Sequence, residues 1–327
     1  MLSIYHEPMP DFIRTLAQTP EMLRLQGIGM NCGCEYTRFA QYRSCRPYAR
    51  YEHSIGVALI VWHFTGDPKQ AVAGLLHDVS SPAFSHVVDF LKGDYCKQEA
   101  TEEKTGEIIE RSAGIRRVLR TLNLRIEEVS DYHLYPIADN DSPRLSADRL
   151  EYTLGNFWGF NTHTRERIAE YYNALTTGKN EDGEDEIMFK EEALATRFAL
   201  ESLENSKRFV HDEDRYAMQY LADLLRQALK RGILTEADLY TTEQRVIEKL
   251  RSDDGLRLEW DRFTAFSSLE YRDTKPEGPG WICVSAKRRY IDPYVMDKGR
   301  VSALSPKAAD AMASFLNRSF DVWMRAQ

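Results

Sequence analysis

The sequence predicts a mainly α-helical protein, and the spacing of its apolar residues carries that prediction. In the segment 54–64 (SIGVALIVWHF), Val57, Ile60, Val61 and Phe64 stand three and four residues apart, as one buried helix face requires. A second observation is that the same period recurs along most of the chain, in segments 69–78, 83–91, 103–111, 147–157, 190–209, 213–230, 242–251 and 306–324.

A third observation is that helix-boundary residues stand where these periodic segments begin and end. Asp67-Pro68 precedes the segment 69–78, as an N-terminal cap followed by proline does. Gly93 follows 83–91, and Gly232 follows 213–230, where each glycine can end a helix. These residues therefore indicate three helix boundaries.

Two segments depart from the helical period. The acidic, glycine-punctuated stretch 177–186 (TGKNEDGEDE) indicates a surface loop between an N-terminal lobe, residues 1–176, and a C-terminal helical lobe, residues 187–327. We expect the two lobes to pack as one unit. Aromatic and β-branched residues after the turn-rich TKPEGPG predict a small β element near residues 281–303.

Composition and charge restrict the class of protein. The 327 residues are 43% hydrophobic and 29% charged, which is typical of a globular protein and excludes a disordered one. The net charge of −8 argues against duplex nucleic acid as a partner, and no apolar stretch is long enough for a membrane span. Without a signal-peptide pattern at the N-terminus, a cytoplasmic protein is expected. Two stretches, 98–110 and 179–192, hold the surplus acid, so a small anionic ligand remains compatible with this charge.

The five cysteines are odd in number and irregularly spaced: Cys32, Cys34, Cys45, Cys96 and Cys283. A chain of this length does not need disulfides for stability, so free thiols are expected. Zinc binding at Cys32, Cys34 and Cys45 remains an alternative, although the sequence offers no evident fourth ligand.

Four residues on core-seeking helices form a candidate metal centre. His77 and Asp78 stand together at the end of the apolar helix AVAGLLHD, and His53 begins the preceding apolar helix, so the two packed helices would bring His53 beside His77. Asp148 lies in another apolar helix, LSADRLEYTLGN, where an uncompensated carboxylate would be costly. This mixed nitrogen and oxygen set suits a divalent ion: Mn, Fe, Ni, Co, Zn or Mg.

The ordered pattern His53, His77-Asp78 and Asp148 resembles that of the HD-domain metal-dependent phosphohydrolases. The blocks RYEHSIGVA, LLHDVSSPAFSH and ADRLEY resemble more narrowly those of the deoxynucleoside-triphosphate triphosphohydrolase branch. MFKEEALATRFAL, KRFVHDEDRYAMQYLADLL and AKRRYIDPYV extend the resemblance, which runs from about residue 20 to about residue 300.

The resemblance implies a helical HD-domain fold in which the four ligands converge on one cavity. It implies a hydrolase in which water attacks a phosphate ester or anhydride, with Asp78 placed between the metal and the water. It also assigns Arg50, Arg149 and Tyr152 to phosphate binding. The expected ligand is a small phosphorylated compound, in particular a nucleotide, and the expected assembly is a homo-oligomer, dimeric or larger.

The sequence departs from the branch pattern in two blocks. HDVSSPAFSH has Ser80 and Ser81 where the branch has glycine and histidine, and Gln98 stands where a histidine precedes Glu99. A serine hydroxyl cannot replace an imidazole that titrates near neutral pH. Candidate catalytic groups are therefore Asp78, Glu99 and His86, with Ser81 and Gln98 facing the substrate. The alternative is a non-catalytic nucleotide-binding or regulatory protein with a degenerate site.

The remaining histidines and one basic run have less specific interpretations. His63, His133, His163 and His211 lack a partner in the sequence and are expected to be surface or structural residues. The run Lys287-Arg288-Arg289 is most simply a solvated edge, and a subunit contact or a nucleotide-phosphate anchor are its alternatives.

Overall fold

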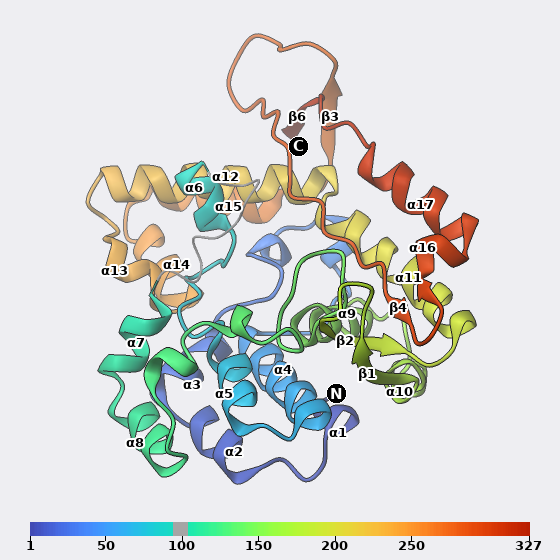
Figure 1. The fold of residues 1–327 in the computed structure, drawn as a ribbon. Coiled ribbons are helices and arrows are strands. Elements are labelled where there is room, and N and C mark those ends of the chain that lie inside the picture. Colours follow the sequence, from blue (N-terminus) through green and yellow to red (C-terminus); the bar gives the residue numbers. More distant parts are fainter. Residues whose placement is uncertain (94–103) are drawn as a thin grey trace.

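The computed structural model describes residues 1–93 and 104–327. Within them, seventeen α-helices account for most of the regular structure, which confirms the mainly α prediction (Figure 1). The helices of the first half are α1 (Leu2–Tyr5), α2 (Asp11–Ala17), α3 (Pro20–Arg24), α4 (Arg50–Thr65), α5 (Pro68–Leu76), α6 (Val87–Lys92), α7 (Thr105–Arg111), α8 (Ala113–Thr121) and α9 (Ala147–Gly159).

The second half contributes the longest helices. Figure 1 shows α12 crossing the molecule, with α6 and α15 against it. The helices of this half are α10 (Arg165–Asn173), α11 (Glu192–Phe209), α12 (Asp212–Lys230), α13 (Glu236–Leu239), α14 (Glu243–Arg251), α15 (Asp254–Ala265), α16 (Val301–Leu304) and α17 (Pro306–Leu316). Short 3-10 turns lie in the connections: η1 (Leu25–Gly27), η2 (Cys34–Tyr36), η3 (Ala40–Tyr42), η4 (Ile126–Glu128) and η5 (Tyr132–Leu134).

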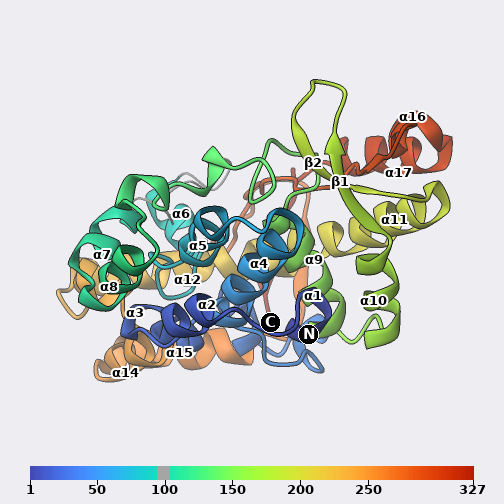
Figure 2. The same ribbon diagram turned by 60° about the horizontal axis from the view of Figure 1, so that its bottom comes forward.

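Six short strands form two small sheets in the described part of the chain. The first has the order β1-β2-β4-β5, with β1 and β2 antiparallel and β2 and β4 parallel, and the second pairs β3 with β6. Figure 2 shows the β1–β2 hairpin projecting beyond the helices. The strands are β1 (Leu175–Lys179), β2 (Asp185–Phe189), β3 (Leu269–Arg272), β4 (Tyr294–Val295), β5 (Gly299–Arg300) and β6 (Trp323–Ala326).

The prediction of a loop over 177–186 is wrong at both ends of this segment, which belong to β1 and β2. Only the turn between them is irregular, and Gly183 takes a φ of 78° there. The acidic composition wrongly suggests that the whole stretch is exposed. Glu186 is fully buried, and its carboxylate forms an ion pair with Arg300 at 2.6 Å.

Three other predicted elements differ in extent. The β element expected at 281–303 is limited to β4, β5 and an isolated bridge between Ile282 and Met324, while 283–293 has no regular structure. The helix predicted over 83–91 begins only at Val87, because Phe84 and Ser85 have positive φ angles of 62° and 48°. The helix predicted over 306–324 ends at Leu316, and the chain then enters β6.

The pair α4 and α5 forms the centre of the N-terminal half, and its boundaries follow the predicted residues. The Asp67 side chain accepts a hydrogen bond from the amide of Lys69 at the start of α5, with Pro68 in its first turn. Gly74 faces Val57 on α4 so closely that an added Cβ would lie 3.2 Å from Cγ1 of Val57. This close approach brings the start of α4 beside the end of α5. The predicted helix ends at Gly93 and near Gly232 are also confirmed.

Two apolar clusters stabilise the described residues. The larger one joins buried residues of α4, α5 and α9 to residues of α11 and α17, so the first 176 residues and the segment after 187 share one core. The second cluster surrounds α12, α14 and α15. Among the described residues, none of the helices combines the length and apolar character needed to cross a bilayer.

Candidate metal centre

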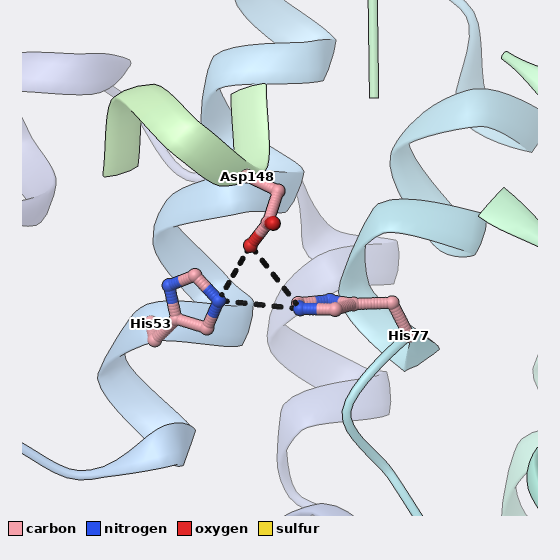
Figure 3. Close-up of side chains that lie close together, drawn as sticks. All are labelled: His53, His77 and Asp148. Atoms are coloured by element: carbon pink, nitrogen blue, oxygen red, sulfur yellow. Dashed lines mark hydrogen bonds and ion pairs between the residues drawn. The ribbon is translucent and has the colours of Figure 1, made fainter. Parts of the chain in front are cut away.

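Three side chains from three helices converge at one point (Figure 3). His53 comes from the first turn of α4, His77 follows the last residue of α5, and Asp148 comes from the first turn of α9. Nε2 of His53 lies 3.2 Å from Nε2 of His77 and 3.0 Å from Oδ1 of Asp148. Nε2 of His77 lies 3.7 Å from the same carboxylate oxygen. Both histidines are buried.

These distances fit a divalent ion. Ligand atoms that each lie about 2.1 Å from one ion, at octahedral or tetrahedral angles, are about 3.0 to 3.4 Å apart. The three donor atoms are close to that spacing, and two imidazoles with a carboxylate suit a transition metal. The structure therefore brings together three of the four predicted ligands in a geometry that can hold a metal.

Asp78, the fourth predicted ligand, lies at the edge of this cluster. Its Oδ2 is 3.5 Å from Nε2 of His77 and 3.7 Å from Nε2 of His53. The same carboxylate accepts hydrogen bonds from Arg50, at 2.8 and 3.1 Å, and from the Ser81 hydroxyl, at 2.7 Å. Burial by itself would raise the pKa of Asp78, but the charges of Arg50, His77 and His53 hold that pKa well below its ordinary value. Asp78 is therefore an anion that can bind a metal or a metal-held water.

Both histidines are oriented by a hydrogen bond from the ring nitrogen that faces away from the cluster. Nδ1 of His77 donates to the carbonyl of Gly74 at 2.8 Å, and Nδ1 of His53 donates to Oε2 of Glu151 at 2.7 Å. Each bond turns Nε2 towards the cluster, a common arrangement around metal-binding histidines.

Glu151 is a functional residue that the sequence analysis missed. It is fully buried, and the hydroxyls of Tyr5 and Tyr48 also donate to its carboxylate. The sequence did contain one indication of its role. Glu151 follows Asp148 by three residues, which places both carboxylates on one face of α9.

In the cluster, the positive charge of His53 and the negative charges of the carboxylates stabilise one another. Burial alone would lower the pKa of His53, yet the hydrogen bonds to Asp148 and Glu151 raise it to about 10. Conversely, burial would raise the pKa of Asp148, but the hydrogen bond and charge of His53, with His77, keep it low. An incoming metal ion must therefore displace a proton from His53.

A cavity of about 630 Å³ opens beside this cluster, and the predicted metal ligands line it. Arg50, His86, Arg149 and Tyr152 line it as well. The Arg50 guanidinium is committed to Asp78 and to the Ser85 hydroxyl, at 3.1 Å. Predicted phosphate-binding residues thus lie at the same cavity as the metal cluster.

Arg149, Tyr152 and His86 differ in how far they are already engaged. Arg149 pairs with Asp139 at 3.1 Å and donates to the carbonyl of Arg144 at 2.7 Å. Burial raises the pKa of Tyr152 to about 12, so its hydroxyl keeps its proton and can donate. Nδ1 of His86 contacts Oδ2 of Asp89 at 2.9 Å. Burial lowers the pKa of His86, the bond to Asp89 opposes that shift, and the charges of Arg289 and Arg50 add to it.

Three residues that the sequence predicts to bind substrate or to act in catalysis are not among the described residues that line the cavity. Ser81 is fully buried behind Asp78, where its hydroxyl supports that carboxylate. Gln98 and Glu99 lie outside the described residues.

The basic run 287–289, predicted most simply as a solvated edge, is only partly solvated, since Lys287 is exposed whereas Arg288 and Arg289 are half-buried. Lys287, Arg288 and Arg289 all line the cavity that holds the metal cluster. The run carries no helical or strand period, so the sequence alone does not decide between a solvated edge, a subunit contact and a nucleotide-phosphate anchor. Cys32 also lines the cavity, and Cys32, Cys34, Cys45 and Cys283 are free thiols.

Comparison with known proteins adds a chemical class to this geometry. No known protein-family profile matches the chain. It is 31% identical over 204 residues to the uncharacterized protein YdhJ of Bacillus subtilis, covering 62% of this chain and 61% of that protein. It is 29% identical over 168 residues to the metal-dependent phosphohydrolase cns2 of Cordyceps militaris, covering 49% of this chain and 44% of that protein. The matches thus span less than two thirds of each relative's length.

Proposed function

We propose that this protein is an HD-type phosphohydrolase that uses a divalent metal to hydrolyse a phosphate ester or anhydride bond. The observation that carries the proposal is the cluster of buried His53 and His77 with half-buried Asp148 on the wall of a cavity that also holds arginines. The name of the relative from Cordyceps militaris supports the same chemistry.

His53, His77 and Asp148 would hold the ion, with Asp78 beside them. A divalent ion in such a site lowers the pKa of bound water and neutralises phosphate charge. Glu151 and the carbonyl of Gly74 fix the two imidazoles, so the donor atoms need little rearrangement. Arg50 and Ser81 hold the Asp78 carboxylate in its ionised form, in which it would bind the ion and accept a hydrogen bond from the attacking water.

Residues around the cavity supply the remaining requirements. Tyr152 can donate its hydroxyl proton to a phosphate oxygen, and Arg149 adds positive charge. His86 lines this cavity next to residues 80–85, and the negative charge of a bound phosphate would raise its lowered pKa, so that its imidazole can take the place of the family histidine and donate a proton to the leaving group.

The substrate that we propose is a nucleotide or a phosphorylated compound of similar size. A cavity of about 630 Å³ falls in the range of small-molecule sites. Its wall combines the cations with apolar and aromatic side chains, among them Met30, Tyr42, Phe209 and Met218, which can pack against a base or another flat group.

The test is a substrate screen with the purified protein. The protein is loaded with Mn²⁺, Mg²⁺, Co²⁺ or Ni²⁺ and assayed for phosphate release from deoxynucleoside triphosphates, nucleoside monophosphates, cyclic dinucleotides and a simple phosphodiester. We expect metal-dependent turnover of at least one class, lost by more than about 100-fold in Asp148→Asn. Nucleotide binding without turnover of any substrate would contradict the enzyme and favour the regulatory alternative.

Metal content provides an independent check of the site. His77→Gln is expected to lose the stoichiometric ion that the parent retains after dialysis. His6→Gln is the matched control, since His6 contacts Trp62 and His63 towards the other end of α4. Full metal content in His77→Gln would refute the ligand assignment.

A further inference from the structure

Residues 284–292 form a strap that is fixed against the rest of the protein although it has no regular structure. At one end, the Arg215 guanidinium donates to the carbonyl of Val284. At the other end, the amide of Asp292 donates to the carbonyl of Pro143 at 2.9 Å, and its carboxylate accepts from the amide of Ser302 at 2.9 Å. In the middle, Arg288 donates to the carbonyl of Arg318 at 2.5 Å.

Most cations on the cavity wall are already paired. Arg50 binds Asp78, Arg149 binds Asp139, and Arg144 binds Asp182 and Glu184. Arg288 is held by the carbonyl of Arg318, and its guanidinium lies 4.3 Å from the centre of the Phe320 ring.

Arg289 differs from these cations. It lines the cavity and is half-buried. Its guanidinium makes no hydrogen bond or ion pair with any residue of the described chain, 1–93 and 104–327. A guanidinium has five donors in a planar fork that matches phosphate oxygens, and a partly desolvated one without a partner is poised to bind an anion.

The position of Arg289 relates it to the metal cluster. Its charge is felt by both His86 and Tyr152, which line the same cavity. Tyr152 follows Asp148 by four residues on α9, about one helical turn or 6 Å along the axis. Arg289, Tyr152 and the metal cluster therefore line one cavity, and its volume of about 630 Å³ is that of a site for one small ligand.

We propose that Arg289 binds a second anionic group of the substrate, so that the preferred substrate carries two anionic groups, one at the metal cluster and one at Arg289. The inference rests on the proposed function only in placing the reacting phosphate at the metal. Simple monoesters with a neutral remainder would leave Arg289 unpaired and would bind more weakly.

Binding of two phosphonate probes tests this assignment without any need for turnover. Methylphosphonate presents one anionic group, and methylenediphosphonate presents two joined by a bond that cannot be hydrolysed. Their affinities are measured by calorimetry with Mg²⁺ in excess of the probe. The parent is expected to bind the diphosphonate at least about 10-fold more tightly, and Arg289→Gln is expected to lose about 10- to 100-fold of that affinity. Methylphosphonate binding should change by less than about 3-fold.

Two further variants separate a local charge effect from a general one. Arg289→Lys keeps the charge and should recover part of the diphosphonate affinity, whereas Arg120→Gln, which removes an exposed arginine from α8, should bind as the parent does. Equal affinity of the parent for both probes, or an unchanged diphosphonate affinity in Arg289→Gln, would overturn the inference.

Failure of this inference and failure of the proposed function give different results. Metal-dependent turnover with unchanged diphosphonate binding in Arg289→Gln would remove only the role of Arg289. Loss of diphosphonate binding in that variant, with no turnover of any substrate by the parent, would leave Arg289 as an anion-binding residue in a protein that is not an enzyme.

Discussion

At the scale of single residues, His53 determines how the metal centre depends on pH. Its imidazole lies between two carboxylates, Asp148 and Glu151, and these raise its pKa to about 10 in the metal-free protein. Only the deprotonated Nε2 can bind a metal, so protons and metal ions compete for this nitrogen.

We therefore expect the apparent metal affinity to rise about tenfold per pH unit between about pH 7 and 9, with one proton released for each ion bound. Calorimetry in buffers of different ionisation enthalpy measures the released protons, and competition with a chelator measures the affinity. An affinity that stays constant over this range would show that His53 is already neutral.

The metal-free protein should show the opposite trend in stability. The pKa of His53 is raised from 6.5 in the unfolded chain to about 10, so its contribution is fully present below about pH 6.5 and is lost as the pH rises through about 10. Unfolding in urea at several pH values measures this loss, and the metal-loaded protein, in which the proton is already displaced, should not share it.

At the scale of elements, the centre depends on how closely α4 and α9 approach each other. Gly56 of α4 faces Glu151 of α9, and a Cβ added at Gly56 would lie 2.5 to 2.7 Å from atoms of the Glu151 side chain. The absence of a side chain at Gly56 therefore leaves room for the carboxylate that orients His53.

Gly56→Ala should consequently affect both the fold and the metal. We expect a loss of about 1 to 3 kcal/mol in the free energy of unfolding from overpacking, together with weaker metal binding as Glu151 is displaced. Gly106→Ala, in α7, meets only Cβ of Ser130 at 3.9 Å and should instead stabilise the protein by up to about 1 kcal/mol. Chemical unfolding and metal titration of both variants measure these effects, and a neutral Gly56→Ala would show that Glu151 can move without consequence.

At the scale of the whole molecule, the sequence predicts the parts of the site that lie on periodic helices. The apolar period correctly predicts that α4 and α5 are helices that pack together. It also correctly predicts that this packing places His53 beside His77. The same reasoning fails where long-range contacts decide the structure. Val295 of β4 pairs with Phe189 of β2, a contact between distant segments, so the sequence assigns the start of β2 to a loop and does not define the extent of β4. Arg289 reaches the cavity for a similar reason, because contacts with distant segments hold its strap in place.

The shared core gives the metal an effect beyond the three helices that bind it. Buried residues of α4, α5 and α9 belong to the same apolar cluster as Phe198 of α11 and Phe315 of α17. A ligand that binds only the folded state adds about 4 kcal/mol of stability at a free concentration about 1,000 times its dissociation constant. Because the cluster is continuous, this stabilisation should reach α11 and α17 as well as the metal-binding helices.

Hydrogen exchange with and without Mn²⁺ tests this coupling. We expect slower exchange on metal binding in peptides from α4, α5 and α9 and also in those from α11 and α17. Asp148→Asn, which removes one donor, should show neither change. If protection rises only in α4, α5 and α9, the N-terminal lobe unfolds independently of the C-terminal helices, and the single cluster seen between them does not make the molecule one cooperative unit.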